Sequence, residues 1–268
     1  MRLKRRVLLG NKDLDKVHGR VVITGMEPGT TRQNVTAADS GMWGQRITGR
    51  HWGILEAKVS YGIDVRTVNM PLRREIFDKV NAWAIKKGWL EFITEASGRR
   101  MYVDEVELPD PGDLWDWTAN YTIIFRAYNV PFWEDTDAQT ITKKKFADGK
   151  EESLKMEIGG TAPSVLDLSF KNVSGKTITN FTLKVGSRTL KLTGVKLEKD
   201  ETLNFTHTQE GILQITADAT RNGKDVSRSV YGLLTGNDDT NVNPGSVTIK
   251  VNATRAGNLT VSNKARWR

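Results

Sequence analysis

The alternation of apolar and polar positions divides the chain into two parts of different character. Up to about residue 135 the patterns predict one amphipathic helix among six or so strands. Beyond residue 163 every apolar pattern has the two-residue period of a β-strand. A single helix among strands predicts an α+β fold, mostly antiparallel, for residues 1–135. We interpret residues 136–163 as a connector and residues 164–268 as an all-β sandwich domain.

The helix is predicted in NMPLRREIFDKVNAWAIKKGW, residues 69–89. Pro71 suits a first helical turn, where its missing N–H group costs nothing. An apolar stripe at helical spacing consists of Leu72, Ile76, Val80 and Trp83. Lys86 and Lys87 suit the last turn, and Gly88 suits the C-cap. The pattern therefore predicts a helix laid on a sheet, with Trp83 in the core.

Strands are predicted around this helix from short apolar runs and alternation. They are expected at residues 21–23, 54–61, 89–94, 99–108 and 120–128. In the last of these one face carries Tyr121, Ile123, Phe125 and Ala127. The stretch MEPGTTRQNVTAADSGMWGQR, residues 26–46, is rich in Gly, Thr, Ser and Asp, and we interpret it as a loop.

The C-terminal part alternates strictly in seven places. The apolar positions are Leu166, Leu168 and Phe170; Phe181, Leu183 and Val185; Leu190 and Leu192; Leu203 and Phe205; Leu213 and Ile215; Val247, Ile249 and Val251; and Leu259 and Val261. Glycine-containing turn dipeptides punctuate these runs. Seven or eight short strands with regular turns are typical of an antiparallel sandwich.

The stretch IIFRAYNVPFWED, residues 123–135, lies where the first part ends. Pro131 disfavours helical geometry in the residue before it. We expect Phe132 and Trp133 to pin the exiting chain to the surface of its own domain or to a neighbouring subunit. The two acids that follow would open the solvated connector.

Composition excludes several kinds of site. The 268 residues include no cysteine, so disulfides, zinc ribbons and thiol nucleophiles are excluded. The net charge is +8, and residues 160–268 carry 15 basic and 9 acidic side chains. This excess suits an anionic partner or a solvated surface, and no motif indicates specific nucleic-acid recognition.

Two further observations bear on localisation. No run of 18 apolar residues is present, so we expect no membrane insertion. The only apolar run near the N-terminus, residues 7–9, is too short for a signal peptide. We therefore expect synthesis in a cytoplasm.

Catalytic chemistry is not indicated. His18, His51 and His207 are scattered and fall in no metal-ligand or nucleophile motif. Glu107 and Glu134 are carboxylates of the type that glycosidases use, but both lie beside turn residues, where acids usually serve only as solvated groups. We predict no catalytic, cofactor-binding or metal-binding residues, and no enzymatic activity.

The order of several segments is more specific than any single motif. A basic helix PLRREIFDKVNAW precedes GRRMYVDEVEL, YTIIFRAYNVPFWED and IGGTAPSVLDLSFKN, and the chain ends in NKARWR. Particular marks are the Gly160–Pro163 stretch and the Arg266-Trp267 terminus. This succession resembles the distal tail protein (Dit) family of siphophages over nearly the whole chain.

The resemblance implies a structural virion protein at the tip of a long, non-contractile tail. Members of that family form a hexameric ring from their N-terminal domains, and a galectin-like β-sandwich projects outward. The ring joins the tail tube to the tail-associated hub protein and to baseplate or receptor-binding proteins, and DNA can pass through it. By this resemblance the expected assembly residues are Tyr128, Phe132, Trp133, Trp83, Arg73 and Arg74.

Two other functions stay open at this point. A cell-surface carbohydrate- or wall-polymer-binding module would suit the basic sandwich, although seven of the eight tryptophans, the residues that stack on sugars, lie in residues 1–135. A hydrolase built on Glu107 and Glu134 is the third hypothesis.

Overall fold

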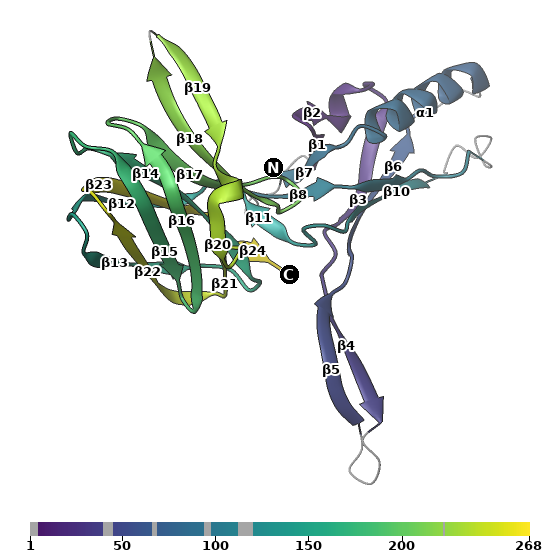
Figure 1. The fold of residues 1–268 in the computed structure, drawn as a ribbon. Helices are drawn as coiled ribbons and strands as arrows, with labels where there is room; N and C mark the ends of the chain where they lie inside the picture. The colour runs from purple at the N-terminus through teal and green to yellow at the C-terminus, as the bar shows by residue number, and fades with distance from the viewer. Residues whose placement is uncertain (1–4, 40–44, 66–68, 94–97, 112–119, 222) are drawn as a thin grey trace. The chain divides into compact units, whose positions relative to one another are not determined.

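The computed structural model describes residues 5–39, 45–65, 69–93, 98–111, 120–221 and 223–268. The chain separates into two compact units, Met1–Thr136 together with Arg268, and Asp137–Trp267 (Figure 1). Both consist mainly of antiparallel strands, and the described residues contain a single α-helix. The mostly antiparallel β prediction with one helix is confirmed.

The first unit contains two sheets, a hairpin and the helix. Its elements are β1 (Arg6–Leu9), β2 (Lys12–Asp13), the 3-10 helix η1 (Leu14–Lys16), β3 (Val21–Glu27), β4 (Gln33–Asp39), β5 (Gln45–Trp52), β6 (Leu55–Ile63), α1 (Met70–Ala84), β7 (Gly88–Ile93), β8 (Arg99–Val103), β9 (Glu105–Glu107), β10 (Asn120–Ala127) and β11 (Trp133–Asp135). Within this unit the strands of one sheet follow the order β2-β1-β7-β8-β11, those of another follow β3-β6-β10-β9, and β4 pairs with β5 alone among the described strands.

The core of this unit lies on one face of the β6–β10 pair. Alternate residues of β6 are buried, and the same holds for β10, as the alternation predicts. The helix α1 covers this face. Phe77 packs edge-on against Tyr121 at 5.1 Å between ring centroids, and Trp83 meets Phe125 at 6.2 Å. The predicted core position of Trp83 is confirmed, since only 5% of the residue is exposed.

The helix begins where the sequence predicts and ends earlier. The side chain of Asn69 accepts a hydrogen bond from the backbone N–H of Leu72 at 3.2 Å and so caps the first turn. The last helical residue is Ala84, so Lys86 lies beyond the helix rather than in its last turn. Gly88 opens β7 instead of capping the helix. The expected C-terminus was wrong because the chain must turn early to place β7 beside β1.

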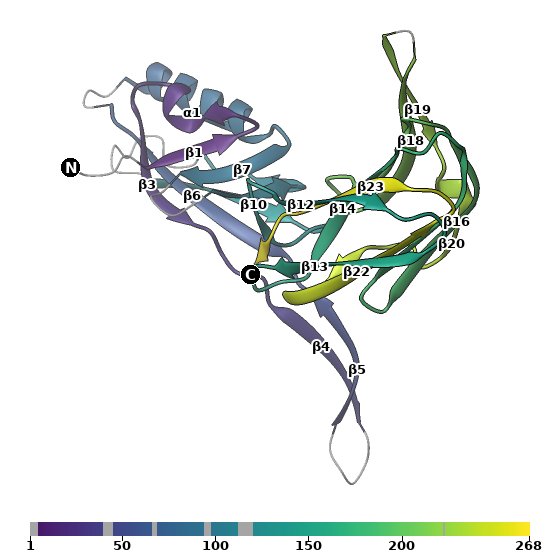
Figure 2. The same ribbon diagram turned by 90° about the vertical axis from the view of Figure 1, so that its left-hand side faces the viewer.

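Residues 26–46, predicted as a loop, are mostly strand. β3 continues to Glu27, and β4 pairs with β5 in a long two-stranded hairpin that projects from the sheet of β3 and β6 (Figures 1 and 2); residues 40–44 lie outside the described part. The loop prediction failed because none of the hairpin side chains whose burial the structure describes is fully buried, and strands without a buried face need no apolar alternation. A second correction concerns residues 99–108, which form two strands, β8 and β9, in different sheets.

The second unit is built from two larger sheets. Its strands are β12 (Gln139–Phe146), β13 (Glu151–Ile158), β14 (Ser164–Asn172), β15 (Ile178–Val185), β16 (Arg188–Leu197), β17 (Thr202–His207), β18 (Leu213–Arg221), β19 (Lys224–Ser229), β20 (Leu234–Gly236), β21 (Asn241–Val242), β22 (Gly245–Ala253), β23 (Gly257–Asn263) and β24 (Arg266–Trp267), with the 3-10 helix η3 (Tyr231–Leu233). One sheet runs β12-β23-β14-β17-β18-β19, with β21 beside β14, and the other runs β13-β22-β15-β16-β20.

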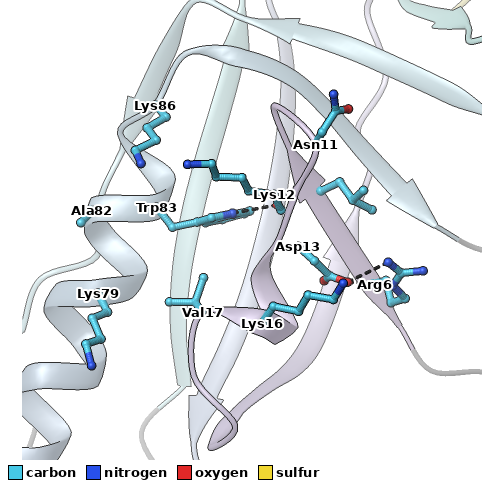
Figure 3. Close-up of a pocket in the computed structure, with 11 residues that line it drawn as sticks. Arg6, Asn11, Lys12, Asp13, Lys16, Val17, Lys79, Ala82, Trp83 and Lys86 are labelled. Atoms are coloured by element: carbon cyan, nitrogen blue, oxygen red, sulfur yellow. Dashed lines mark hydrogen bonds and ion pairs between the residues drawn. The ribbon is translucent and has the colours of Figure 1, made fainter.

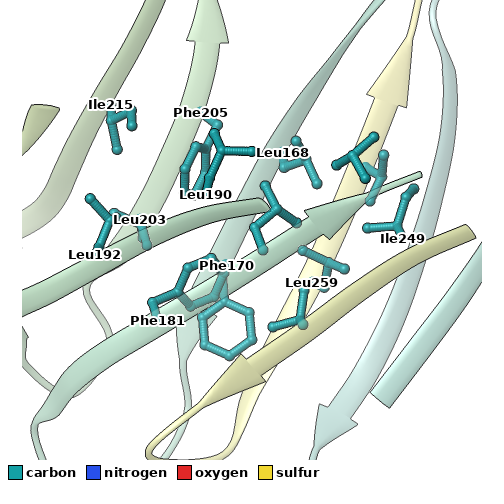
Figure 4. Packing of buried hydrophobic residues seen from close by; sticks show 14 of the residues in the cluster. Leu168, Phe170, Phe181, Leu190, Leu192, Leu203, Phe205, Ile215, Ile249 and Leu259 are labelled. Atoms are coloured by element: carbon teal, nitrogen blue, oxygen red, sulfur yellow. The ribbon is translucent and has the colours of Figure 1, made fainter. Parts of the chain in front are cut away.

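One apolar core fills this unit, and most of its residues come from the predicted alternations (Figure 4). The core also contains residues that the alternations did not include, among them Phe146 and Met156. Phe170, Phe181 and Phe205 stack in sequence at centroid distances of 5.0 and 5.7 Å. The close packing leaves no room for a side chain at Gly257, where a Cβ would lie 2.1 Å from the Phe170 ring.

The predicted connector at residues 136–163 is largely strand. β12 pairs with β23 and β13 pairs with β22, so both belong to the sheets of the second unit. Charged side chains occupy exposed positions of these edge strands, as Glu151, Lys155 and Glu157 do in β13, and such a charge-rich segment is easily taken for a connector. β12 and β13 are each the last strand of their sheet.

Two distant marks of the family resemblance meet in the second unit. The backbone N–H groups of Thr161 and Ala162 donate to the carbonyl of Arg266, at 2.9 and 3.1 Å. Gly160 has a positive φ of 94°, and a Cβ there would lie 2.2 Å from the Arg266 carbonyl oxygen. Only glycine allows the two segments to approach so closely.

Candidate assembly interface

The β4–β5 hairpin, called the hairpin arm below, exposes most of those of its side chains that the structure describes. Residues 32–37 are all exposed, and so are Arg50 and His51 on the paired strand. Val35, opposite Arg50, is 51% exposed although it is apolar. A two-stranded ribbon with no second layer is at best marginally stable in water. Its free edges and exposed apolar side chain therefore suit an element that becomes ordered against a partner.

The base of the hairpin arm is clamped to the body of the first unit. Trp52, the last residue of β5, packs edge-on against Phe132 at 5.1 Å between centroids. The hydroxyl of Thr31 donates to the carbonyl of Pro131. The indole N–H of Trp133 donates to the carbonyl of Pro28 at 2.8 Å. The stretch that ends the first unit thus holds the segment that leads into the arm.

Two further close contacts join the base of the hairpin arm to the core of the first unit. Trp133 also packs against Phe92 of β7, with 5.5 Å between ring centroids. Gly29, between β3 and the arm, lies against β6 so closely that a Cβ would come within 1.8 Å of the Glu56 carbonyl oxygen. Since its φ is +63°, glycine is required there on both counts. The direction in which the arm leaves the sheet is therefore set by buried contacts.

The six residues predicted for assembly fall into two groups. Phe132, Trp133, Trp83 and Arg73 are buried within the chain, with 6%, 5%, 5% and 2% of their surface exposed. Tyr128 is 44% exposed, and the side chain of Arg74 is 61% exposed. The structure brings Phe132 and Trp133 together at the arm's base, while Arg73, Arg74 and Trp83 lie on α1. A direct contact with another subunit stays a prediction for Tyr128 and Arg74. The four buried residues would contribute to assembly indirectly, by holding the exposed residues of the interface in place.

Tyr128 lies at the acidic end of the β9–β10 pair. Its hydroxyl donates to the carboxylate of Glu105. This hydrogen bond, together with the negative charge of Glu105, raises the pKa of Tyr128 above its ordinary value. The carboxylate of Asp104 accepts from the backbone N–H groups of Tyr128 and Asn129, at 2.7 and 3.1 Å. The turn after β10 is thereby fixed.

The carboxylates considered for hydrolysis are held by arginines in different sheets. Glu134 of β11 pairs with Arg100 at 3.4 Å, and Glu107 of β9 pairs with Arg126 at 2.5 Å. His207 lies in the second unit and has a structural role: its side chain is 5% exposed, and its Nδ1 lies 2.9 Å from Asp167 Oδ1. Within the described ranges no group of three or more His, Asp or Glu side chains could hold a metal ion.

The hairpin arm is the main feature that sequence reasoning missed. Its only local signals are the short Val35-Thr36 pair and the Asp39-Ser40-Gly41 turn composition. These signals fit a hairpin and a loop equally well. A buried face, which usually distinguishes the two, is not found among the arm residues whose burial is described.

Comparison with known proteins supports a phage-tail fold. No protein-family model and no curated protein sequence matches the chain. Among solved structures, the SPP1 Dit (gp 19.1) protein, described as a paradigm of the hub adsorption apparatus in phages that infect Gram-positive bacteria, aligns with a TM-score of 0.64. The alignment covers 97% of this chain and 98% of that chain at 14% identity.

Two structures of the phage P2 baseplate in its activated conformation align less well. The form with Ca has a TM-score of 0.48 at 10% identity, covering 98% of each chain. The form with Sr has a TM-score of 0.46 at 11% identity, covering 96% of this chain and 97% of that one. The resemblance to distal tail proteins is confirmed at the level of the fold by the SPP1 structure.

Proposed function

We propose that this chain is a structural protein of the distal end of a long, non-contractile phage tail, where six copies form a ring. The observation that carries the proposal is the fold shared with SPP1 Dit along nearly the whole chain. Shared fold alone does not specify function. The hairpin arm adds independent support, since an exposed ribbon anchored by Trp133 and Phe132 is better suited to a neighbouring subunit than to solvent.

In this proposal the first unit, close to residues 1–135, makes the ring and the second unit is a galectin-like sandwich. The ring would join the tail tube to the tail-associated hub protein and to baseplate or receptor-binding proteins, leaving a channel through which DNA can pass. The protein would be found at the virion tail tip and would have no enzymatic activity. None of the helices described is long and apolar enough to span a membrane.

The test is the mass of the purified protein in solution. Native mass spectrometry and electron microscopy should find six copies in a closed ring, or a pair of such rings, at micromolar concentration. A protein that stays monomeric at that concentration, and also in the presence of the phage's tail tube and hub proteins, would contradict the proposal.

A second candidate function, carbohydrate or wall-polymer binding, draws support from a polar cavity in the second unit. This cavity has a volume of about 420 Å³ and is lined by Asp200, Asp218 and Asp225 together with three hydroxyl side chains and Lys171. Carboxylates and hydroxyls are suitable partners for sugar hydroxyl groups, but no aromatic residue lines the cavity for stacking. A glycan array and a host cell-wall pull-down distinguish the candidates: a ring component alone should bind neither, whereas a binding module should lose its ligand on Asp218→Ala.

A further inference from the structure

A basic cavity of about 530 Å³ lies between α1 and the N-terminal strands of the first unit (Figure 3). It is called the basic pocket below. Five cationic side chains line it, Arg6, Lys12, Lys16, Lys79 and Lys86, with a single carboxylate, Asp13. The tight Gly10-Asn11 turn, in which both residues have positive φ, brings β2 beside the helix.

Three of the five cations have no counter-ion among the described parts of the chain. Arg6 pairs with Asp13 at 2.8 Å, and Lys79 pairs with Glu75 one turn earlier on α1 at 2.5 Å. Lys12, Lys16 and Lys86 make no ion pair with any residue that the structure describes. The basic pocket therefore keeps an excess of three positive charges after the Arg6–Asp13 and Lys79–Glu75 pairs are counted.

Two of these free cations are held close together. The indole N–H of Trp83 donates to the backbone carbonyl of Lys12 at 2.9 Å and fixes that residue against the helix (Figure 3). The Lys12 ammonium is within hydrogen-bonding reach of Lys86 and repels it, so the pKa of Lys86 lies below its ordinary value. An anion bound between the Lys12 and Lys86 ammonium groups would relieve this repulsion.

A complementary acidic surface lies on the same unit. Strand β9 is the last strand of its sheet and pairs only with β10 among the described strands. Its residues Glu105 and Glu107 have side chains that are 49% and 54% exposed. Arg126 contacts both, but it is shared with a third carboxylate, Glu56. With Asp104 beside it, this surface, called the acidic edge below, keeps an excess of negative charge.

The basic pocket and the acidic edge lie on opposite faces of one sheet. Trp83 of α1 lines the basic pocket and packs on the face of β10 that carries Phe125. Glu105 and Glu107 pair in register with Arg126 and Ile124, which alternate with Phe125 and therefore point to the other face. Complementary surfaces on opposite faces of a domain allow a head-to-tail contact between copies, and repetition of that contact closes a ring when the rotation permits.

We propose that the basic pocket receives the acidic edge of a second copy of the chain, with the Glu105 and Glu107 carboxylates lying among Lys12, Lys16 and Lys86. This inference rests on the proposed ring. Residues two apart in a strand project from the same face about 7 Å apart, so one strand presents two carboxylates to separate ammonium groups. The outer edge of β9 has no partner among the described strands, and this edge and the exposed Leu108 beside it suit a protein better than a small anion.

The test is charge reversal with rescue. Lys12→Glu combined with Lys86→Glu should lower the ring fraction at least tenfold at a concentration where the unmodified protein is assembled. Glu105→Lys with Glu107→Lys should do the same. Mixing the two variants, or combining all four changes in one chain, should restore the ring, because each contact again joins opposite charges. Mass photometry across a concentration series measures the ring fraction.

Controls separate a lost contact from a damaged fold. Lys155→Glu with Lys191→Glu reverses the same number of exposed charges in the second unit and should leave assembly unchanged. Glu105→Gln with Glu107→Gln avoids placing lysines beside Arg126 and should weaken assembly less than reversal does. Thermal unfolding of each variant should match that of the unmodified protein.

The outcomes distinguish this inference from the proposed function. Rings that persist in the Lys12→Glu, Lys86→Glu variant overturn the pocket contact and leave the ring intact. If the unmodified chain forms no ring, the proposed function fails, and a synthetic peptide of residues 103–109 then tests the contact separately. Binding of the peptide to the unmodified chain but not to the Lys12→Glu, Lys86→Glu variant supports the pocket contact. Absence of binding to the unmodified chain overturns the pocket contact. Inorganic phosphate that binds at Lys12 and Lys86 while reversal leaves rings unchanged makes the basic pocket an anion site only, which also overturns the proposal.

Discussion

The side chain of Trp133 makes two stabilising contacts. Its ring packs beside Phe92, and its indole N–H donates a hydrogen bond to the carbonyl of Pro28. The residue is 5% exposed, so substitution acts on folding and on the placement of the hairpin arm rather than on a surface contact. This differs from an active-site tryptophan, whose loss would leave stability unchanged.

Trp133→Ala should destabilise the first unit by about 3–5 kcal/mol, because it leaves a large cavity and an unsatisfied carbonyl. Trp133→Phe should cost less, since most of the packing is kept. Chemical denaturation measures both, and limited proteolysis should cut Trp133→Ala within the segment leading to the hairpin arm. Tyr231→Ala, at a residue that is 42% exposed in the second unit, is the control and should change stability little. Equal stability of Trp133→Ala and the unmodified protein would contradict the clamp.

Arg126 is the shared cation of three carboxylates, Glu56, Glu105 and Glu107. Its hydrogen bond is the main reason that the pKa of Glu56 lies below the ordinary value of 4.5. A lowered pKa in the folded state stabilises the fold above the ordinary value, and this contribution is lost as pH falls through the folded pKa.

Arg126→Met should therefore raise the pKa of Glu56 and reduce stability at pH 7 by up to about 1 kcal/mol, the range of partly exposed ion pairs. The difference from the unmodified protein should shrink toward about pH 3, where carboxylates are protonated. NMR titration of Glu56 and denaturation at both pH values measure these effects. Arg74→Met, which removes an exposed ion pair with Asp78, is the matched control. A stability loss that is the same at both pH values would show that Arg126 acts by packing alone.

At the scale of elements, the hairpin arm and β6 follow each other in the chain and differ in what covers them. β6 is paired on both edges, with β3 and β10, and buries every second residue. Among the described strands β4 and β5 pair only with each other, and most of their described side chains are exposed. Local opening should therefore cost much less free energy in the arm than in β6.

Hydrogen–deuterium exchange on unassembled protein should show amides of β4 and β5 exchanging at least on the order of 100-fold faster than those of β6 and β10. In the ring the same amides should become protected, while those of β6 change little. Hairpin-arm amides that are as protected as β6 amides before assembly would contradict the view that the arm needs a partner.

At the scale of the whole molecule, the two units have separate apolar cores. Phe125 is fully buried in the first unit, and Phe181 is 1% exposed in the second. Each unit is of ordinary domain size, large enough to bury a core of its own.

Calorimetry should therefore resolve two unfolding transitions, each sensitive to one core. Phe125→Ala should lower one transition and Phe181→Ala the other, each by ~10 °C or more, from a loss of about 3–5 kcal/mol. The exposed Tyr231→Ala again serves as the control. A single transition that both substitutions lower equally would show that the units unfold as one cooperative body.

Much of this protein follows from periodicity alone. Leu55, Ala57, Val59 and Tyr61 on β6, and the seven alternations of the second unit, could be assigned because burying one face of a sheet forces a two-residue repeat. The helix followed from its apolar stripe for the same reason. The hairpin arm and β12 could not be assigned, because their sequences carry no regular apolar alternation, and the arm residues whose burial is described are mostly exposed.

Only the tertiary structure decided what the chemically suggestive residues do. The sequence indicated that IIFRAYNVPFWED ends the first part, but contacts 100 or more residues apart, Thr31 with Pro131 and Trp133 with Pro28, make it the clamp of the hairpin arm. Lys12 and Lys86 are separated by a helix and several strands and carry no joint pattern. Their convergence on Trp83 is set by packing, because side-chain proximity across elements depends on the fold, whereas periodicity depends only on local geometry.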